Sequence, residues 1–344
     1  MKKLSEHFSW RTYLFFGVAL IASVLLCICV GSVSIPLSDT VTALWNSLWG
    51  MEIPAGISKS IILNVRLPRV LNVALVGAAL SLCGAAMQGL LRNPLADGST
   101  LGVTSGASLG AVLALALGIT IPGTSYGGTM LMAMLFAFLS LAAILGLAYA
   151  LDRSLATNSI ILIGVIFSMF ASSVINLVIS FAEEHIKSIT FWTMGSLSGT
   201  NFSHTRILFG AVLLCGGVIL RYSRELNAFA IGEDNARHIG VHVRRVKLII
   251  LVTVSVLIGV CVSVSGSISF VGLVMPHMTR MITGPNHKRL LPASMFSGAI
   301  FLLLADLAAR TLLRPIELSI GVVTSLVGAV AFVAIFYRTR KGRG

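Results

Sequence analysis

Long apolar stretches, separated by short polar segments, run along almost the whole chain. Most of them are long enough to cross a hydrocarbon core of roughly 30 Å as a helix. We therefore expect an all-α polytopic membrane protein in which residues 1–344 form a single transmembrane domain. The pattern predicts about ten transmembrane helices, at residues 13–33, 69–91, 98–118, 129–151, 158–181, 205–221, 247–266, 269–283, 292–310 and 317–337.

Two longer polar segments interrupt the apolar pattern. Residues 34–61 contain Trp45 and Trp49, which are typical of a membrane interface, and predict an outer loop. Residues 226–245 are polar and basic, and are long enough for two short helices on the inner side. The short span 269–283 is expected to be tilted or shielded by its neighbours.

The charge distribution sets the expected orientation. The chain is 56% hydrophobic and 11% charged, with a formal net charge of +13. Its basic residues gather at the ends of the predicted spans rather than on one soluble face, which argues against a nucleic-acid-binding protein. Most of the 25 Lys and Arg residues fall on inner segments if the N-terminus is inside. This bias predicts an even number of spans and places both termini in the cytoplasm.

The sequence contains few motifs that indicate catalysis or metal binding. It lacks the G-x-x-x-x-G-K-[ST] motif of P-loop ATPases and the H-E-x-x-H motif of zinc proteases. All five cysteines lie in apolar segments, which argues against a disulfide framework and a zinc site. We therefore predict no catalytic residue, no cofactor and no bound metal. Asp306 stands four residues before Arg310, and this spacing predicts an ion pair on one helix face.

Four glycines recur at every fourth position of the predicted span 98–118. They are Gly98, Gly102, Gly106 and Gly110. In lipid, helices associate through close backbone approach at small residues, so this stripe predicts tight packing against one neighbouring helix. A helix that flanks a moving pathway and slides on its neighbour would show the same stripe.

Four arginines depart from the excess of positive charge on the inner side. Arg66 and Arg69 open the second span, whereas Arg310 and Arg314 close the ninth, so all four are expected at the outer mouth. One interpretation is that they lie at helix ends with their charged heads in water. The other is an exposed basic rim that docks an acidic partner and sets its register.

Several stretches together resemble one transporter family. They are RLPR (66–69), the segment from Val76 to Ala107 that contains RNPLADG, FWTMGSLSG (191–199), SISFVGLVMPHMTR (267–280), LLLADLAAR (302–310) and ELSIGVVTSLVGAVAFV (317–333). They look like the permeases of binding-protein-dependent ABC importers for iron-siderophores, heme and cobalamin, the FecCD type. This resemblance implies a fold like that of the cobalamin permease, two permeases side by side, two cytoplasmic ATPases and an extracytoplasmic solute-binding protein.

The resemblance also implies roles for single residues. Arg66, Arg69 and Arg310 would receive glutamates of the binding protein, with Arg314 as an additional contact. The inner loop would hold coupling helices that fit the ATPase, with Gly232, Glu233, Ala236, Arg237 and Gly240 at the contact. A cytoplasmic gate would be built from Asn93, Leu95, Thr157 and Asn158.

These observations predict a non-enzymatic permease subunit that imports a ferric siderophore across the cytoplasmic membrane of a bacterium. Heme and cobalamin are alternative substrates, and the second permease is expected to be a paralogue or a copy of this chain. An ion-coupled secondary transporter is an alternative from another class. The scarcity of acids in the spans argues against proton coupling but leaves sodium coupling open. A channel is a third possibility.

Overall fold

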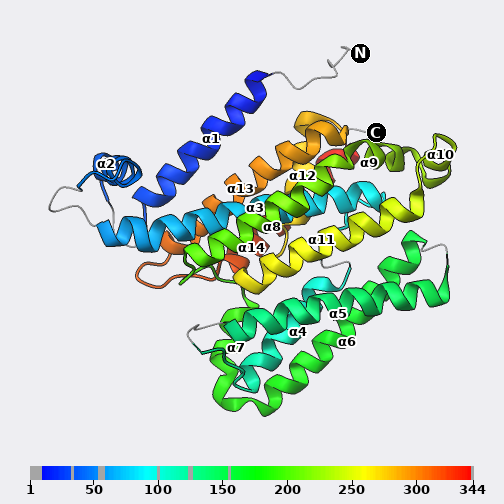
Figure 1. Cartoon of the computed structure of the whole chain (residues 1–344), viewed down its shortest axis with the longest axis horizontal. Helices are drawn as coiled ribbons and strands as arrows, with labels where there is room; N and C mark the ends of the chain where they lie inside the picture. The colour runs from blue at the N-terminus through cyan, green and yellow to red at the C-terminus, as the bar shows by residue number, and fades with distance from the viewer. Residues whose placement is uncertain are drawn as a thin grey trace.

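The computed structural model describes residues 10–31, 35–52, 59–98, 101–122, 127–153 and 156–341, and all regular elements in these ranges are helices (Figure 1). Two are short non-α turns, the π-helix η1 (Ile61–Arg66) and the 3₁₀-helix η2 (Glu183–His185). The α-helices are α1 (Trp10–Cys29), α2 (Leu37–Leu48), α3 (Leu67–Leu90), α4 (Val103–Ala116), α5 (Gly127–Leu151), α6 (Thr157–Phe181), α7 (Ile186–Thr193), α8 (Phe202–Arg221), α9 (Ser223–Ile231), α10 (Glu233–His238), α11 (Val243–Ser265), α12 (Val271–Thr283), α13 (His287–Thr311) and α14 (Ile320–Lys341).

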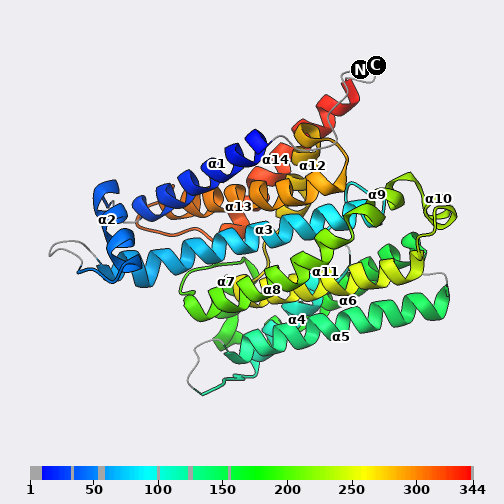
Figure 2. The same ribbon diagram turned by 45° about the horizontal axis from the view of Figure 1, so that its top comes forward.

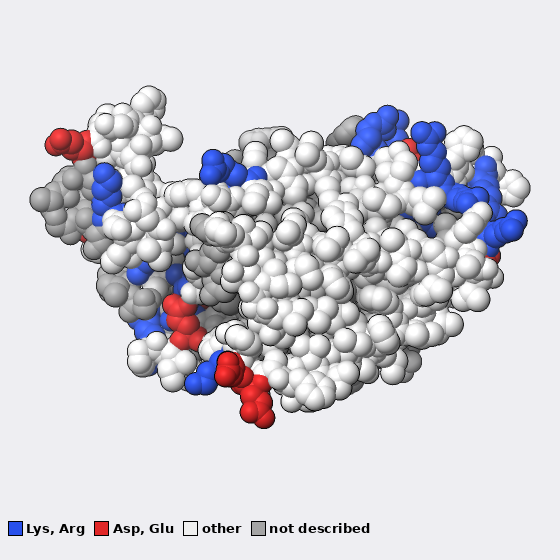
Figure 3. All heavy atoms as spheres, turned by 60° about the horizontal axis from the view of Figure 1, so that its bottom comes forward, with Lys and Arg blue, Asp and Glu red and all other residues white. Residues whose placement is uncertain are grey.

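Seven helical segments of the described chain are long and apolar enough to cross a membrane. They are α1, η1 with α3, α5, α6, α8, α11 and α13, and each coincides with a predicted span. The three other predicted spans correspond to α4, α12 and α14. α4 and the apolar part of α14 are shorter, and α12 has 13 residues, about 20 Å of helix. On the visible face, charged side chains gather toward the ends, with a largely uncharged band between them (Figure 3).

Helix α3 lies at the centre of the bundle and is largely buried. Its Gly77 meets Gly298 of α13, and its Gly84 meets Gly272 of α12, so closely that a Cβ at either α3 position would collide with the facing carbonyl. Close approach of this kind is the main source of helix association in lipid. The small residues of α3 therefore hold α12 and α13 against it.

The remaining long helices pack around this centre in two groups. α4, α5 and α6 contact one another, and α11 lies between them and α3 (Figures 1 and 2). The inner loop contains α9 and α10, the two short helices predicted for residues 226–245. α9 begins three residues before this range, at Ser223. The loop after α1 contains α2, in which Trp45 contacts Trp49 at the helix end.

The predicted helix over 98–118 begins later than expected, which corrects the glycine stripe. Gly102 has a φ of +70°, a left-handed conformation that cannot continue a right-handed helix, so α4 starts at Val103. Gly98 precedes the helix and faces Ile258 of α11, whereas Gly102 faces Ile144 of α5. The four glycines therefore do not form one continuous helical stripe.

The packing prediction holds for the two glycines inside α4. Gly106 rests against Ser140 and the carbonyl of Phe136, and Gly110 rests against the carbonyl of Met132. All three of these neighbours belong to α5. A side chain at either glycine would push α4 away from α5, so this pair forms the close contact expected of small residues spaced by four.

Candidate docking, coupling and gate sites

The RLPR stretch enters the bundle through an unusual turn. Pro68 has no N–H to donate to the carbonyl of Asn64, so regular α-helical bonding cannot continue back through this point. The preceding residues Ile61–Arg66 form a wider π-helical turn, in which the N–H of Leu67 bonds to the carbonyl of Ile62. This turn places Arg66 at the start of α3, with its side chain directed into the protein.

Arg66 binds the C-terminal end of α1. Its Nη1 donates to the carbonyl oxygens of Ile28 at 2.6 Å and Cys29 at 3.0 Å. The last carbonyls of a helix have no partner within the helix and carry the negative end of its dipole. A guanidinium group meets both needs, so Arg66 acts as a C-terminal cap supplied by another helix.

Arg310 of α13 caps the same end of α1. It donates from Nη2 to the carbonyl of Cys27 at 3.2 Å and from Nη1 to that of Val30 at 3.4 Å. Gly31 lies between the two guanidinium groups: a Cβ built there would be 2.9 Å from Arg66 Nη2 and 3.4 Å from Arg310 Nη1. The glycine leaves the space in which both arginines reach the helix end.

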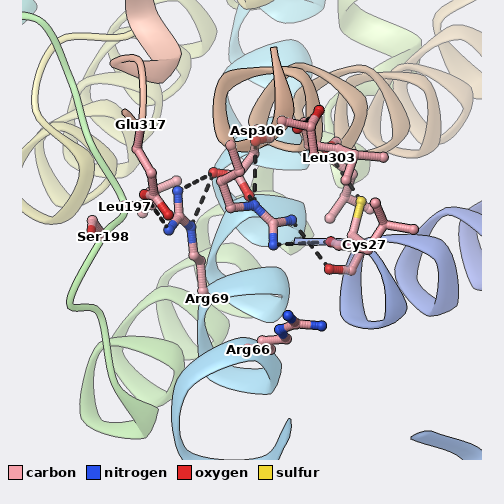
Figure 4. Close-up of polar contacts among 12 residues, drawn as sticks. Cys27, Arg66, Arg69, Leu197, Ser198, Leu303, Asp306 and Glu317 are labelled. Atoms are coloured by element: carbon pink, nitrogen blue, oxygen red, sulfur yellow. Dashed lines mark hydrogen bonds and ion pairs between the residues drawn. The ribbon is translucent and has the colours of Figure 1, made fainter. Parts of the chain in front are cut away.

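Asp306 connects two of the predicted arginines. Its Oδ2 lies 2.9 Å from Arg310 Nε, which confirms the ion pair expected from their spacing, while the Nε hydrogen points to the backbone carbonyl of Asp306. Its Oδ1 accepts from Arg69 Nη2 at 3.0 Å. Arg69 in turn donates from Nη1 to Glu317 Oε2 at 2.9 Å, so that it lies between two carboxylates (Figure 4).

The expected exposed basic rim is wrong for Arg66 and Arg310, which are 5% and 4% exposed. Arg69 has a side-chain exposure of 13%, and of the four arginines only Arg314 is exposed. The two acids, Asp306 and Glu317, also neutralise much of the positive charge. Sequence reasoning missed Glu317. The available signal was an acidic residue close in sequence to Arg310 and Arg314, two residues beyond Pro315. A docking role for these arginines stays a prediction.

A cavity of about 500 Å³ opens near these helix ends, between α5, α7, α8 and the end of α11. Its polar lining includes Lys187, Trp192 and His204, together with the hydroxyl residues Thr129, Ser188, Ser196, Ser198, Thr200, Ser263 and Ser265. No Asp or Glu lines it. The cavity therefore offers neutral hydrogen-bonding groups and a single ammonium rather than metal ligands.

The predicted coupling segment is anchored to two long helices. Gly232, with a φ of +130°, separates α9 from α10. The next residue, Glu233, accepts at Oε1 from Thr157 Oγ1 at 3.1 Å, and the same atom lies 2.7 Å from Nζ of Lys247. Thr157 begins α6, and Lys247 lies in the first turns of α11 with its side chain 1% exposed. Sequence reasoning missed Lys247 as the partner of this carboxylate, because Lys247 follows Arg244 and Arg245 and resembles one more basic residue of the inner loop.

The outward face of α10 differs from the one expected. Ala236 is fully buried within its own chain, so in this conformation it does not offer a small residue to a partner. Arg237 is exposed and pairs with Asp234 at 3.2 Å, and Gly240, with a φ of +88°, is exposed after the helix. Ile231 and Ile239, 67% and 68% exposed, flank α10. Two exposed apolar side chains thus lie on either side of α10, while its small residue Ala236 points into the chain.

The predicted gate residues lie in two different settings. Asn93 stabilises its turn, with Oδ1 accepting from the N–H of Leu95 at 2.9 Å, and Leu95 lines a cavity of about 270 Å³ beside α11 and α12. Thr157 instead binds Glu233, and Asn158 is exposed. Arg92, next to Asn93, reaches the coupling segment, since a Cβ on Gly232 would be 3.7 Å from its Nη1. Both segments that carry the predicted gate residues therefore adjoin the junction of α9 and α10.

A family model described as the FecCD transport family matches residues 19–338, almost the full length of this chain. The chain belongs to the FecCD family. It is 43% identical to the uncharacterized ABC transporter permease protein YvrB of Bacillus subtilis strain 168, over 94% of this chain and 92% of that protein. It is 35% identical to the molybdate import system permease protein MolB of Haemophilus influenzae, over 95% and 96% of the two chains.

Other members of the FecCD family are named for different cargoes. Relatives at 32–36% identity include permeases for hemin, iron(3+)-hydroxamate, cobalamin and iron(3+) dicitrate. A solved structure described as an inward-facing metal-chelate type ABC transporter matches with a TM-score of 0.83 and 31% identity, covering 96% of this chain and all of that one. The chain is thus a multi-pass membrane permease of the ABC importer type, a transport subunit that works with a partner permease, ATPases and a substrate-binding protein.

Proposed function

We propose that this chain imports a ferric siderophore across the cytoplasmic membrane of a bacterium, driven by ATP hydrolysis on partner chains. The family match over residues 19–338 carries the proposal for import. The likeness to a metal-chelate type transporter, and to permeases named for iron hydroxamate and iron dicitrate, favours a preformed iron chelate as cargo.

The chemistry of the 500 Å³ cavity supports a chelate over a bare ion. A siderophore already encloses its iron, so the permease needs shape and neutral hydrogen-bonding groups rather than ligands for the metal. Within the described ranges no group of three or more His, Cys, Asp and Glu residues is placed to hold a metal ion. Heme and cobalamin are alternatives on the same ground. Molybdate is a second candidate, because Lys187 and His204 in the cavity suit a small oxyanion.

The proposed partner contacts lie at opposite ends of the bundle. Docking of the binding protein would begin at Arg314, which is exposed, and at Arg69, which is held between carboxylates. The ATPase would cover α10 and its flanking isoleucines. The junction of α9 and α10 would pass its movement to the gate segments that carry Arg92 and Thr157.

Uptake measurements test the proposal. Cells with and without this chain are supplied separately with labelled ferric hydroxamate, hemin, cobalamin and molybdate, with the partner ATPase intact or inactivated in its P-loop lysine. We expect only ferric hydroxamate uptake to require both this chain and an active ATPase. Molybdate uptake in its place would overturn the cargo but keep the import mechanism. Uptake that survives ATPase inactivation and collapses with an ionophore would instead identify a secondary transporter.

A further inference from the structure

A basic pocket lies where α8, α9 and α13 meet. It has a volume of about 560 Å³ and is lined by Leu220, Arg221, Ser223, Arg224, Lys288 and Pro292. Arg221 is the last residue of α8, Arg224 belongs to the first turn of α9 and Lys288 to the first turn of α13. Three helices thus bring one cation each to the same place, at the end of the bundle where Lys and Arg side chains gather in Figure 3.

The cations of this pocket have no acidic partner within ion-pair distance. In the part of the chain that the structure describes, none of the three forms an ion pair. The adjacent Glu225 does not line the pocket. No side chain caps the N-terminus of α9, at which Ser223 and Arg224 lie. The first N–H groups of a helix and the positive end of its dipole favour an anion at such a position.

An apolar path leads along α8 to this pocket. Leu213, Gly217 and Arg221 recur at spacing four and therefore lie on one side of the helix. Leu213 and its neighbour Leu214 are 64% and 72% exposed, and nothing lies within 4 Å of a Cβ built on Gly217. An apolar strip that ends in a group of cations is complementary to an anionic phospholipid, because the acyl chains can lie on the strip and the charged headgroup can reach the cations.

We propose that this pocket binds the phosphate headgroup of an anionic phospholipid, with the acyl chains lying on the exposed face of α8. Basic pockets between transmembrane helices on the cytoplasmic side bind such headgroups. The proposal depends on the membrane orientation of the proposed function, since it places Arg221 and Lys288 at the inner leaflet, but not on the transported cargo. The adjoining lipid-facing strip favours a lipid over a soluble partner such as the ATPase.

Lipid binding by the purified full-length chain tests this proposal. The chain in neutral detergent is titrated with fluorescent phosphatidylglycerol, with phosphatidylethanolamine as the zwitterionic comparison. The test variant replaces Arg221, Arg224 and Lys288 by Gln, and a control replaces Arg153, Arg244 and Arg245 by Gln, which removes equal charge from the same side. A charge-assisted hydrogen bond to a phosphate oxygen strengthens binding about tenfold or more, and only the cations that line the pocket can make one to a headgroup bound there. The test variant should therefore bind phosphatidylglycerol at least about a hundredfold more weakly.

Each further outcome decides the proposal. The control variant should keep wild-type affinity, binding should weaken with salt, and thermal unfolding should show that both variants are folded. An equal loss of lipid affinity in the control variant would show that the positive charge attracts the lipid unspecifically, and would contradict a specific site in this pocket. Competition by inorganic phosphate at concentrations equal to the lipid would identify a free-anion site instead. If the test variant binds the lipid normally but no longer binds the partner ATPase, the pocket belongs to the contact with that partner. Because transport is not measured, failure here leaves the proposed function standing.

Discussion

Glu233 at the start of α10 accepts a hydrogen bond from Thr157 at the start of α6, with 3.1 Å between Oε1 and Oγ1. The same carboxylate binds the buried ammonium of Lys247 on α11 at 2.7 Å. One side chain thus joins the short helix that we propose for the ATPase contact to two long helices of the bundle. A shift of α10 must therefore move α6 and α11 or break these bonds.

Loss of this carboxylate should destabilise the chain. Glu233→Ala removes the carboxylate that pairs with the buried ammonium of Lys247, and breaking a buried ion pair from one side in general costs about 3–5 kcal/mol. We expect a clearly lower thermal unfolding midpoint in detergent, and recovery of most of it in Glu233→Ala/Lys247→Met, which removes both charges. Thr157→Val should cost about 1 kcal/mol. Asp234→Ala removes an exposed neighbouring carboxylate and should change little; an equal effect there would refute a special role for Glu233.

The capping of α1 by Arg66 can be tested through a neighbouring thiol. Cys29 is buried beside the carbonyls that Arg66 binds, and its Sγ donates to Thr40. Removing hydrogen bonds to a charged group costs about 1.5–3 kcal/mol, so Arg66→Ala should open the helix end and raise the labelling rate of Cys29 by a maleimide about tenfold or more. The measurement uses a chain in which Cys27, Cys83, Cys215 and Cys261 are replaced by Ser.

The control for this experiment is Arg206→Ala, which removes an exposed arginine from α8. It should leave the labelling of Cys29 unchanged. If Arg66→Ala labels no faster than wild type, the two hydrogen bonds to Ile28 and Cys29 do not hold the end of α1 closed.

The outer arginines show what a sequence can and cannot predict. Their number and their position at helix ends follow from the chain, and so does the Asp306–Arg310 pair, because both residues lie on one helix. The burial of Arg66 does not follow, since its partners are backbone carbonyls of α1, 37 and 38 residues away in the sequence. Every residue has a backbone carbonyl, so the residue types do not reveal which carbonyls Arg66 will bind.

The helices divide in the same way. Hydropathy alone predicts the seven long spans, because length and apolar content decide whether a helix crosses a membrane. It fails at the start of α4, because the left-handed backbone of Gly102 delays the helix until Val103, and residue spacing does not reveal backbone angles. It also missed Gly77 and Gly84, because their partners come from α13 and α12.

The close contacts of α3 give a third prediction. Gly84→Val places a branched side chain against the carbonyl of Gly272, so α12 must move away from α3. We expect a loss of more than about 3 kcal/mol, measured as a lower thermal midpoint and a reduced yield of folded protein. Gly146→Ala on α5 is the control, because nothing lies near its Cβ position. It should stabilise the chain by about 0.5–1 kcal/mol. Equal tolerance of both changes would show that α3 and α12 are not in close contact.

The two carboxylates around Arg69 give the last prediction, which depends on the proposed docking role. Glu317 is 38% exposed and occupies Arg69 Nη1, the group that an acidic side chain of the binding protein would need. Exposed ion pairs contribute roughly 0.2–1 kcal/mol, so Glu317→Gln should release Arg69 Nη1, while Nη2 stays bound to Asp306, and should strengthen docking by up to about fivefold.

The affinity of the purified importer for its binding protein, at low and high salt, measures this effect. Glu184→Gln is the matched control, since it removes an exposed carboxylate elsewhere in the described chain. A general change in surface charge would strengthen docking equally in both variants and vanish at high salt. A gain confined to Glu317→Gln, and lost again in Glu317→Gln/Arg69→Gln, would tie the effect to this guanidinium. Weaker docking in Glu317→Gln would instead show that the carboxylate holds Arg69 in its docking geometry, and that the acid does not compete with the partner.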